Sequence, residues 1–462
     1  MKTRFRKALL WGIALVVLLP IVLYTVAVAI NHEDRAPSPA AVRLEEVGRA
    51  LPPVEDRDNA YFIILGFSAV KEADPAAVGR ARSDWLHAQR LLPELQRGDS
   101  FPGQGQPLLR EHDKEIQQLF DRCKKVDAPC VAALDKLALH RPRLDREAWR
   151  RERYVALLAN TAFREPQHLD PALPMMPYAP VLEGQKLHML DAWSRSGSGD
   201  VAGVKARLDA DLRFWRMVLA ESDLLITKMI AAHAVAQNLA WTNVVLRRLP
   251  NHLIADAMPD QLSDPISNPE RSMLRSFAGE LRYSASVTRE LKRSLDAHEV
   301  PGGSGALGDV LATRLGAPLI QVQDTLNLQA QFFVDVDERM TVDYRALPAV
   351  VRMYRQTETD TGPIFPRSFY NPLGSMLAEA ARGQFEKYGE RTADLEGVRR
   401  ATLLAAQLRM KGVEAAEMAQ ALDGALLRDP YTGRAFAWDS STQSIVFQGL
   451  EAGQRGRHAV LY

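Results

Sequence analysis

Residues 201–220 read VAGVKARLDADLRFWRMVLA, and residues 224–249 read LLITKMIAAHAVAQNLAWTNVVLRRL. In the first run, apolar residues recur at the three- and four-residue spacing of an α-helix. The second run is apolar on most of its circumference, which is typical of a buried helix. A further helical pattern at 187–193 precedes them, followed by Ser-Gly-Ser-Gly at 196–199. Helix, short glycine-containing turn and helix together predict a helical hairpin.

Helical patterning continues along most of the chain, although no regular 34-residue period is present. Asp74-Pro75 provides a good N-cap followed by proline at the first helical position. Near the C-terminus, Asp429–Gly433 has turn chemistry, and the alternating runs Arg434–Trp438 and Ser444–Gln448 predict a small β-hairpin. We therefore expect an all-α fold, an irregular array of helical hairpins that is tetratricopeptide-like in places, with this β-hairpin at its end.

The N-terminus has the pattern of a membrane anchor. No residue from Ala8 to Ile30 is charged, and four cations precede this run. A bilayer core needs about 20 apolar residues in a helix, so the run is long enough to span. By the positive-inside bias, residues 1–7 form a cytoplasmic stub and the body lies across the inner membrane, in the periplasm. The sequence thus predicts a single-pass protein whose residues 8–30 contact inner-membrane lipid.

A cleavable signal peptide is the alternative to this anchor. Ala27-Val28-Ala29 offers an A-x-A cleavage pattern, so cleavage after Ala29 stays open. The apolar run is longer than the usual secretory core of about 7–15 residues, which favours the uncleaved anchor. The predicted organisation is then a stub at 1–7, an anchor at 8–30, a proline-bearing linker at 31–57, a helical periplasmic domain at 58–428 and a β-hairpin with tail at 429–462.

Charge and cysteine content restrict the function. Outside residues 1–30 there are 54 basic and 57 acidic residues, which gives no reason to expect a nucleic-acid partner. The chain has two cysteines, Cys123 and Cys130, with six residues between them. In an oxidising compartment a close pair predicts one disulfide. Two free thiols are the alternative, and the spacing does not match a C-x-x-C redox motif or a zinc site.

Several short stretches, taken together, resemble a known group of proteins. They are Asn59-Ala-Tyr-Phe, the Cys123–Cys130 turn, Arg153-Tyr154, Leu212–Trp215, Leu225–Met229, Asn371-Pro-Leu-Gly and Asp429–Gly433. In this order the chain resembles membrane-anchored helical envelope proteins of proteobacteria that have no assigned function. The resemblance covers most of the chain. It implies a helical fold and an envelope location, and it carries no catalytic residues over to this sequence.

Two motif matches lack the context that their chemistry needs. Ser68-Ala-Val-Lys71 matches the S-x-x-K nucleophile motif, but the S-D-N and K-T-G partners of that motif are missing. Gly303–Gly308 spells G-x-G-x-x-G, but a polar helical pattern, not a strand, precedes it. We interpret the first match as coincidence and the second as a flexible turn. The sequence therefore offers no catalytic, cofactor-binding or metal-binding set.

Polar residues on the apolar helical run at 224–249 are candidates for structural roles. His233 and Gln237 lie one turn apart, and a lone polar group in such a helix is usually a hydrogen-bonded core residue. Lys228 lies on the opposite side, where a buried ammonium needs a counter-charge. Glu280 is one possible partner. We expect a buried ion pair between Lys228 and Glu280 in preference to a functional site.

An arginine-rich stretch and the helical pattern lead to two hypotheses of function. Arg141–Arg153 contains six arginines interleaved with three acids. It could meet anionic lipid or a polyanionic polymer, although mixed signs at helical spacing more often indicate a solvated face. Helical arrays are mostly binding scaffolds, which favours a non-catalytic binding or scaffold protein of the cell envelope, with an envelope protein or polymer as partner. The alternative is a hydrolase or transferase that acts on envelope polymers in a groove between hairpins.

Overall fold

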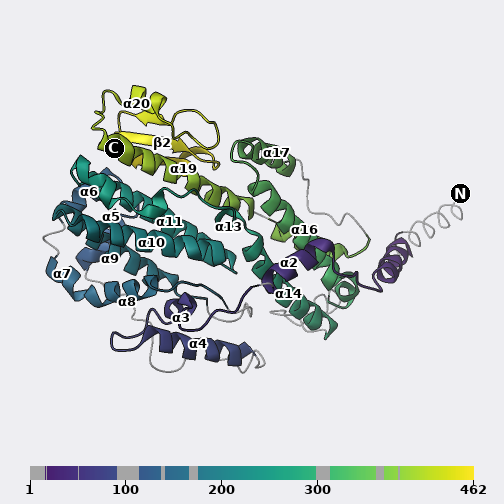
Figure 1. The fold of residues 1–462 in the computed structure, drawn as a ribbon. Helices are drawn as coiled ribbons and strands as arrows, with labels where there is room; N and C mark the ends of the chain where they lie inside the picture. The colour runs from purple at the N-terminus through teal and green to yellow at the C-terminus, as the bar shows by residue number, and fades with distance from the viewer. Residues whose placement is uncertain are drawn as a thin grey trace, which may run out of the picture. The chain divides into compact units, whose positions relative to one another are not determined.

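The computed structural model shows a mostly helical protein with one small antiparallel sheet at the C-terminal end (Figure 1). It describes residue 16 and residues 18–49, 51–90, 114–136, 141–165, 175–297, 313–359, 369–382 and 385–462. The mostly helical fold and the small C-terminal β-structure predicted from the sequence are confirmed. The G-x-G-x-x-G stretch at Gly303–Gly308 lies outside the described residues.

The helices and strands have the following bounds. The α-helices are α2 (Pro39–Arg49), α3 (Ala60–Leu65), α4 (Pro75–Arg90), α5 (Lys114–Arg122), α6 (Ala128–Leu134), α7 (Arg141–Arg146), α8 (Ala148–Leu158), α9 (Tyr178–Gly197), α10 (Val201–Glu221), α11 (Leu225–Arg247), α12 (Ile254–Ala257), α13 (Asn268–Arg271), α14 (Leu274–Asp296), α16 (Val322–Met340), α17 (Leu347–Thr359), α18 (Pro372–Ala381), α19 (Phe385–Met410) and α20 (Met418–Gly424). The strands are β1 (Ala437–Asp439), β2 (Ser444–Gln448) and β3 (Arg457–Leu461).

The chain forms two compact units. Unit 1 comprises Met1–Arg49, Glu280–Asp335 and Gln356–Gln384, and unit 2 comprises Ala50–Gly279, Val336–Arg355 and Phe385–Tyr462. Each unit is therefore assembled from segments that are far apart in the sequence.

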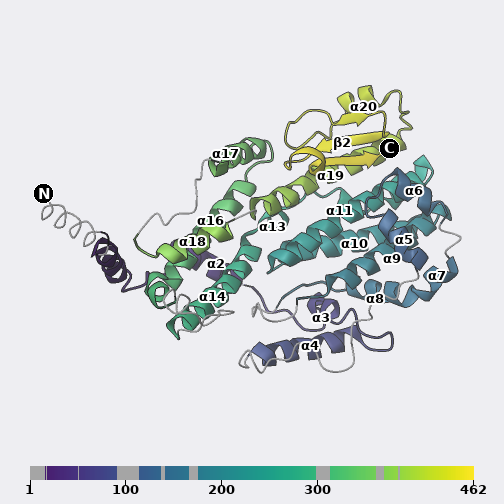
Figure 2. The ribbon, with the colours of Figure 1, turned by 180° about the vertical axis from the view of Figure 1, so that it is seen from behind.

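The core of unit 2 consists of α9, α10 and α11, with α19 packed along α11; the two opposite views agree on this (Figures 1 and 2). The turn between α9 and α10 contains Gly199, whose φ of +73° lies in the left-handed region that favours glycine. Asp200 then caps α10, because its carboxylate accepts the amide of Gly203 at 2.9 Å. The helical hairpin predicted around the glycine-containing turn is present as α9 and α10. Most of α11 is buried, as its composition indicates.

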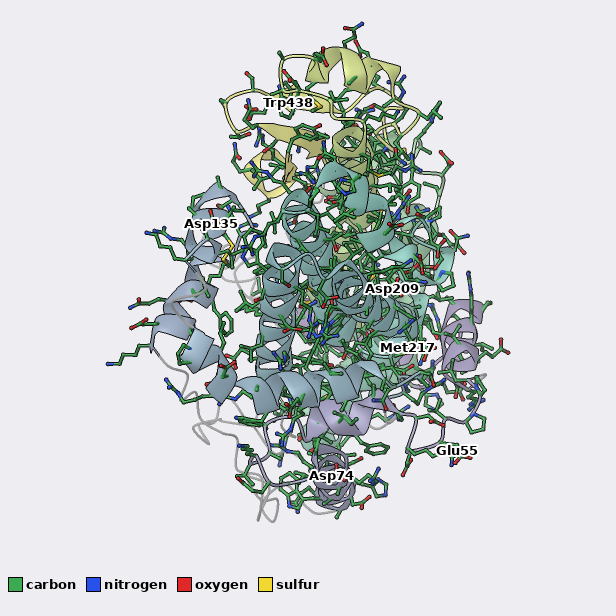
Figure 3. The ribbon with its side chains drawn as sticks, turned by 60° about the vertical axis from the view of Figure 1, so that its left-hand side comes forward. Glu55, Asp74, Asp135, Asp209, Met217 and Trp438 are labelled. Atoms are coloured by element: carbon green, nitrogen blue, oxygen red, sulfur yellow. A yellow bond between two sulfur atoms is a disulfide. The ribbon has the colours of Figure 1, made fainter. Side chains whose placement is uncertain are left out.

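Cys123 and Cys130 form a disulfide between the end of α5 and the first turn of α6 (Figure 3, beside Asp135). Asp127 caps α6 by accepting the amide of Cys130 at 3.1 Å. Both half-cystines are buried in one apolar cluster with residues of α9 and α11, among them Trp193 and Trp241. The predicted disulfide is confirmed, and it lies in the core.

The first helices of unit 2 begin where the sequence places their caps. Asp74 accepts the amide of Ala76 at 3.0 Å, so the predicted N-cap of α4 is confirmed (Figure 3 labels Asp74). Asn59 caps α3 by accepting the amide of Tyr61 at 3.1 Å. The Asn59 side chain also accepts the amide of Arg164 and donates to its carbonyl. This exchange fixes the start of α3 beside the extended segment 162–165, which carries Glu165.

The C-terminal sheet has the order β1-β2-β3, with both pairs antiparallel. Strands β1 and β2 correspond to the predicted hairpin, and β3 is a third strand that the sequence pattern did not reveal. The sheet covers α19 (Figure 1). The contact is close, because the Phe447 ring of β2 occupies the space that a Cβ on Gly397 of α19 would need.

The segment predicted to be a linker at 31–57 belongs to unit 1 up to Arg49, and this part is ordered by specific contacts. The Asn31 side chain donates to the carbonyls of Ala27 and Phe369, at 2.7 Å each, and accepts the amide of Asn371. The Asp34 carboxylate accepts two amides in the first turn of α16, and α2 follows within the same segment. The segment therefore differs from a free linker because its polar side chains find partners some 300 residues away in the sequence.

The predicted membrane anchor is not supported. Residues 1–15 and 17 lie outside the described residues, and the helix is described continuously over 18–30. In the part of the chain that the structure describes, no helix combines the length and apolarity that a membrane crossing requires. A span needs about 20 apolar residues, more than this helix shows. The prediction of a single-pass inner-membrane protein, anchored by 8–30 with its body in the periplasm, is corrected accordingly. The lipid contact predicted for Ala8–Ile30 depended on it.

Gly397→Ala tests the close contact between α19 and the sheet. The added methyl group would meet the Phe447 ring, so we expect a loss of about 1–3 kcal/mol in the free energy of unfolding, measured by urea denaturation. Gly424→Ala in α20 is the matched control, since no described atom lies within 4 Å of its Cβ position. Equal stability of the two variants would contradict the packing.

Candidate functional site

Ionisable side chains gather in several clusters among the described residues of unit 2, and three of these clusters are considered in turn. The first surrounds Asp211 of α10, which is fully buried between helices. Its carboxylate accepts hydrogen bonds from the Tyr154 hydroxyl, from Gln185 at 3.0 Å and from Asn238 at 2.9 Å. These three donors come from α8, α9 and α11. One carboxylate therefore joins four helices.

The donors around Asp211 are themselves held by further hydrogen bonds. Trp215 donates to the Tyr154 hydroxyl at 2.7 Å, and Gln185 and Asn238 also donate to backbone carbonyls. Burial raises the pKa of Asp211 to about 6, while the hydrogen bonds from Tyr154, Gln185 and Asn238 act in the opposite direction. A buried carboxylate with this many partners is a structural element of the core.

The second cluster lies at the N-terminal end of α11. Glu165 is buried, and its carboxylate accepts the amides of Asp223 and Leu224, at 2.9 and 3.0 Å, and the Thr227 hydroxyl. These amides belong to the two residues that directly precede α11, and Thr227 lies in its first turn. Burial raises the pKa of Glu165 to about 8, although these hydrogen bonds act to lower it. Glu165 thus fixes the turn that leads into α11, from a segment distant in the sequence.

Lys228 lies one turn further along α11, and only 2% of it is exposed. Its ammonium donates to the carbonyl of Leu219 at 2.7 Å. Burial lowers the pKa of Lys228 to about 7, and the charges of Asp337 and Glu270 raise it only in part. The predicted burial of Lys228 is present, and its hydrogen bond goes to a backbone carbonyl. The pairing with Glu280 stays a prediction.

The third cluster, named here the Asp191 cluster, lies nearer the surface. The Asp191 carboxylate of α9 pairs with Arg151 of α8 at 3.2 Å, Arg195 of α9 at 2.9 Å and Arg207 of α10 at 2.8 Å. Arg195 also contacts Asp200 at 2.5 Å. Burial acts to raise the pKa of Asp191, but the arginines, Arg195 first, hold it below its ordinary value. Three guanidiniums from three helices thus surround one carboxylate.

His188 lies one turn before Asp191 on α9 and is buried. Its Nε2 is 3.0 Å from the carbonyl of Arg207, and its Nδ1 has no hydrogen-bond partner in the described part of the chain. Burial lowers the pKa of His188 to about 4, and the charges of Arg207 and Arg151 lower it further. The ring therefore stays neutral beneath the arginines.

The structure separates the residues of the S-x-x-K match. Ser68 is buried and its hydroxyl has no hydrogen-bond partner among the described residues, whereas Lys71 is exposed. The loop that carries them is fixed by Arg153, whose guanidinium donates to four carbonyls between Phe67 and Ala73 at 2.7–3.2 Å. Among the described residues no hydrogen bond links Lys71 to Ser68. The interpretation as coincidence is consistent with this geometry.

Two other predicted features have different surroundings from those expected. His233 of α11 is exposed, and Gln237 makes one long hydrogen bond, 3.5 Å, to the carbonyl of Lys124. Neither belongs to the clusters around Asp211 or Glu165. Among the residues that the structure describes, no group of histidine, cysteine and acidic side chains is arranged to hold a metal ion.

The sequence analysis missed Asp211, Glu165 and the Asp191 cluster. Asp211, Glu165 and Asp191 are acidic residues within or beside a helical pattern, and acidic residues at such positions are normally solvated. One signal was available for Asp211, since it stands among Leu208, Leu212 and Trp215 on the apolar face of α10. No local signal identifies Glu165, whose partners lie about 60 residues away.

The pH dependence of the stability of Glu165→Gln tests whether the buried Glu165 carboxyl group is protonated in the folded protein. In the folded protein the pKa of Glu165 is raised to about 8, so the unfolded chain loses this proton at lower pH than the folded chain. The free energy of unfolding of the wild type, relative to the variant, should therefore fall as pH rises from about 4.5 to about 8. Urea denaturation of both proteins across this range measures the difference. Parallel pH profiles would exclude a protonated Glu165.

Comparison with known proteins adds no relative to these observations: no family model, no curated protein and no solved structure matches this chain. The resemblance to membrane-anchored envelope proteins of proteobacteria stays a prediction.

Proposed function

We propose that the protein is a non-catalytic binding or scaffold protein, whose helices present a surface to a partner protein or polymer. One observation carries the proposal. The buried ionisable groups with shifted pKa values, Asp211, Glu165 and Lys228, make hydrogen bonds to helix backbone or to neighbouring side chains. These groups stabilise the helices, and interactions with a partner are left to the surface.

The packing of α9, α10 and α11 gives further support. Short turns join them in sequence, and each contacts the other two. An irregular array of helical hairpins is the finer description that suits this arrangement. Such arrays mostly serve as binding scaffolds, which is an argument from fold analogy.

The alternative is a hydrolase or transferase that acts on a polymer. Glu165 and Lys228 have the shifted pKa values that general acids and bases use. Only 1% of Glu165 and 2% of Lys228 is exposed, so neither reaches a substrate from the surface in this conformation. The binding function is therefore the better supported of the two.

Photo-crosslinking in cells that express the full chain tests the proposal. A photoreactive residue in place of Val155, which is 43% exposed on α8, samples the surface beside the Asp191 cluster. Asp423 on α20, also exposed, is the control position. We expect a discrete adduct from position 155 that is absent from position 423, with mass spectrometry identifying the captured partner.

Two results would contradict the proposal. One is the absence of any adduct from position 155 and from further exposed positions on α9 and α10. The other is polymer turnover by the purified protein that Glu165→Gln or Lys228→Met abolishes while the fold, followed by circular dichroism, is retained. The second result would establish the enzymatic alternative.

A further inference from the structure

We propose that Arg151, Arg195 and Arg207 form a binding site for a phosphate group carried by the partner molecule. This inference rests on the binding function proposed above and names the chemistry of recognition. The three side chains come from α8, α9 and α10 and converge on Asp191. Their side chains are 34%, 35% and 27% exposed, whereas that of Asp191 is 13% exposed. The guanidiniums thus form the outer part of the cluster.

Most N–H donors of these guanidiniums remain available. Each guanidinium has five N–H donors in a planar fork. In the described structure Arg151 and Arg207 each use one nitrogen, both toward Asp191, and Arg195 uses two, toward Asp191 and Asp200. The remaining donors lie on side chains that are about one third exposed. An incoming anion can therefore be bound without displacing Asp191.

The charges of the cluster are not balanced. Three guanidiniums face two carboxylates, those of Asp191 and Asp200, which leaves one excess positive charge. The positive charges of Arg207 and Arg151 also lower the pKa of the nearby His188, after the larger effect of its burial. The excess positive charge indicates a place where an anion is stabilised.

Phosphate suits this geometry better than carboxylate. A carboxylate has two acceptor oxygens in one plane, and in this cluster that of Asp191 already pairs with all three guanidiniums. A phosphomonoester has three acceptor oxygens and carries a charge of about −1.5 to −2 at pH 7. It can accept from three guanidiniums that approach from different helices. Arginine is also the side chain that binds phosphate oxygens in pairs, which a lysine cluster would not do.

Calorimetric titration of the full-length protein tests the site. The probes are inorganic phosphate and glycerol 3-phosphate, with acetate at equal ionic strength as the comparison. Vesicles that contain phosphatidic acid, compared with vesicles of phosphatidylcholine, show whether the phosphate is that of a lipid headgroup or of a soluble molecule. We expect saturable binding of a phosphate probe and weaker binding of acetate.

Arg195→Gln combined with Arg207→Gln should weaken phosphate binding about a hundredfold or more, because two charged hydrogen bonds to the phosphate are lost. Arg213→Gln is the matched control, since Arg213 lies on α10, is 60% exposed and lies outside the Asp191 cluster, paired with Asp209 at 3.5 Å. Circular dichroism melts establish that each variant is folded. If the double variant unfolds, Arg151→Gln alone provides the test, with a smaller loss expected.

Three results would overturn the site: no binding of any phosphate probe, equal binding of phosphate and acetate, or equal losses in the double variant and in Arg213→Gln. Such a result leaves the binding function standing if crosslinking from position 155 still captures a partner. Conversely, polymer turnover that depends on Glu165 overturns the binding function and leaves the phosphate titration unaffected. The phosphate site and the binding function can therefore be contradicted independently of each other.

Discussion

The hydrogen bonds that converge on Asp211 are the constraint on which the rest of unit 2 depends. A buried carboxylate is costly unless its oxygens are paired. Here the required donors come from Tyr154, Gln185 and Asn238, each on a different helix. The cost of burial is offset only when each of these helices has the rotation about its axis and the position along it that bring its donor to Asp211. The carboxylate thus specifies how α8, α9, α10 and α11 pack, which apolar contacts alone would leave less restricted.

The same principle recurs away from this centre. Glu165 fixes the extended segment 162–165 against the start of α11, and Arg153 fixes the loop at 67–73 against α8. At the other end of the unit, Glu396 of α19 pairs with Arg399 at 2.8 Å and accepts the amide of Ile266 at 3.0 Å. In each case a buried ionisable side chain satisfies backbone groups that belong to another segment. The helices are therefore held at defined positions, which suits a protein that presents a fixed surface. The arginines of the Asp191 cluster belong to that surface, on helices that Asp211 holds in place.

Sequence patterns predicted the local features of this structure well. The helix pair at 187–249, the cap at Asp74, the Cys123–Cys130 disulfide and the C-terminal β-structure all depend on residues that are close in sequence. Features that depend on distant partners were missed. Residues 31–57 have the composition of a linker, but Asn31 and Asp34 are ordered by residues near 321 and 371. Likewise, the sequence around Arg151 predicts a solvated charge, whereas in the structure Arg151 pairs with Asp191 of the next helix. The membrane anchor was inferred from apolar length alone, and the described helix does not provide that length.

The stability of Asp211→Ala tests the central claim most directly. The substitution leaves three buried donors without their acceptor, so the free energy of unfolding in urea should fall by at least about 3 kcal/mol relative to the wild type. Asp423→Ala, at an exposed position on α20, should change it by less than about 0.5 kcal/mol. An Asp211→Ala protein as stable as the Asp423→Ala control would show that this network does not hold the helices together.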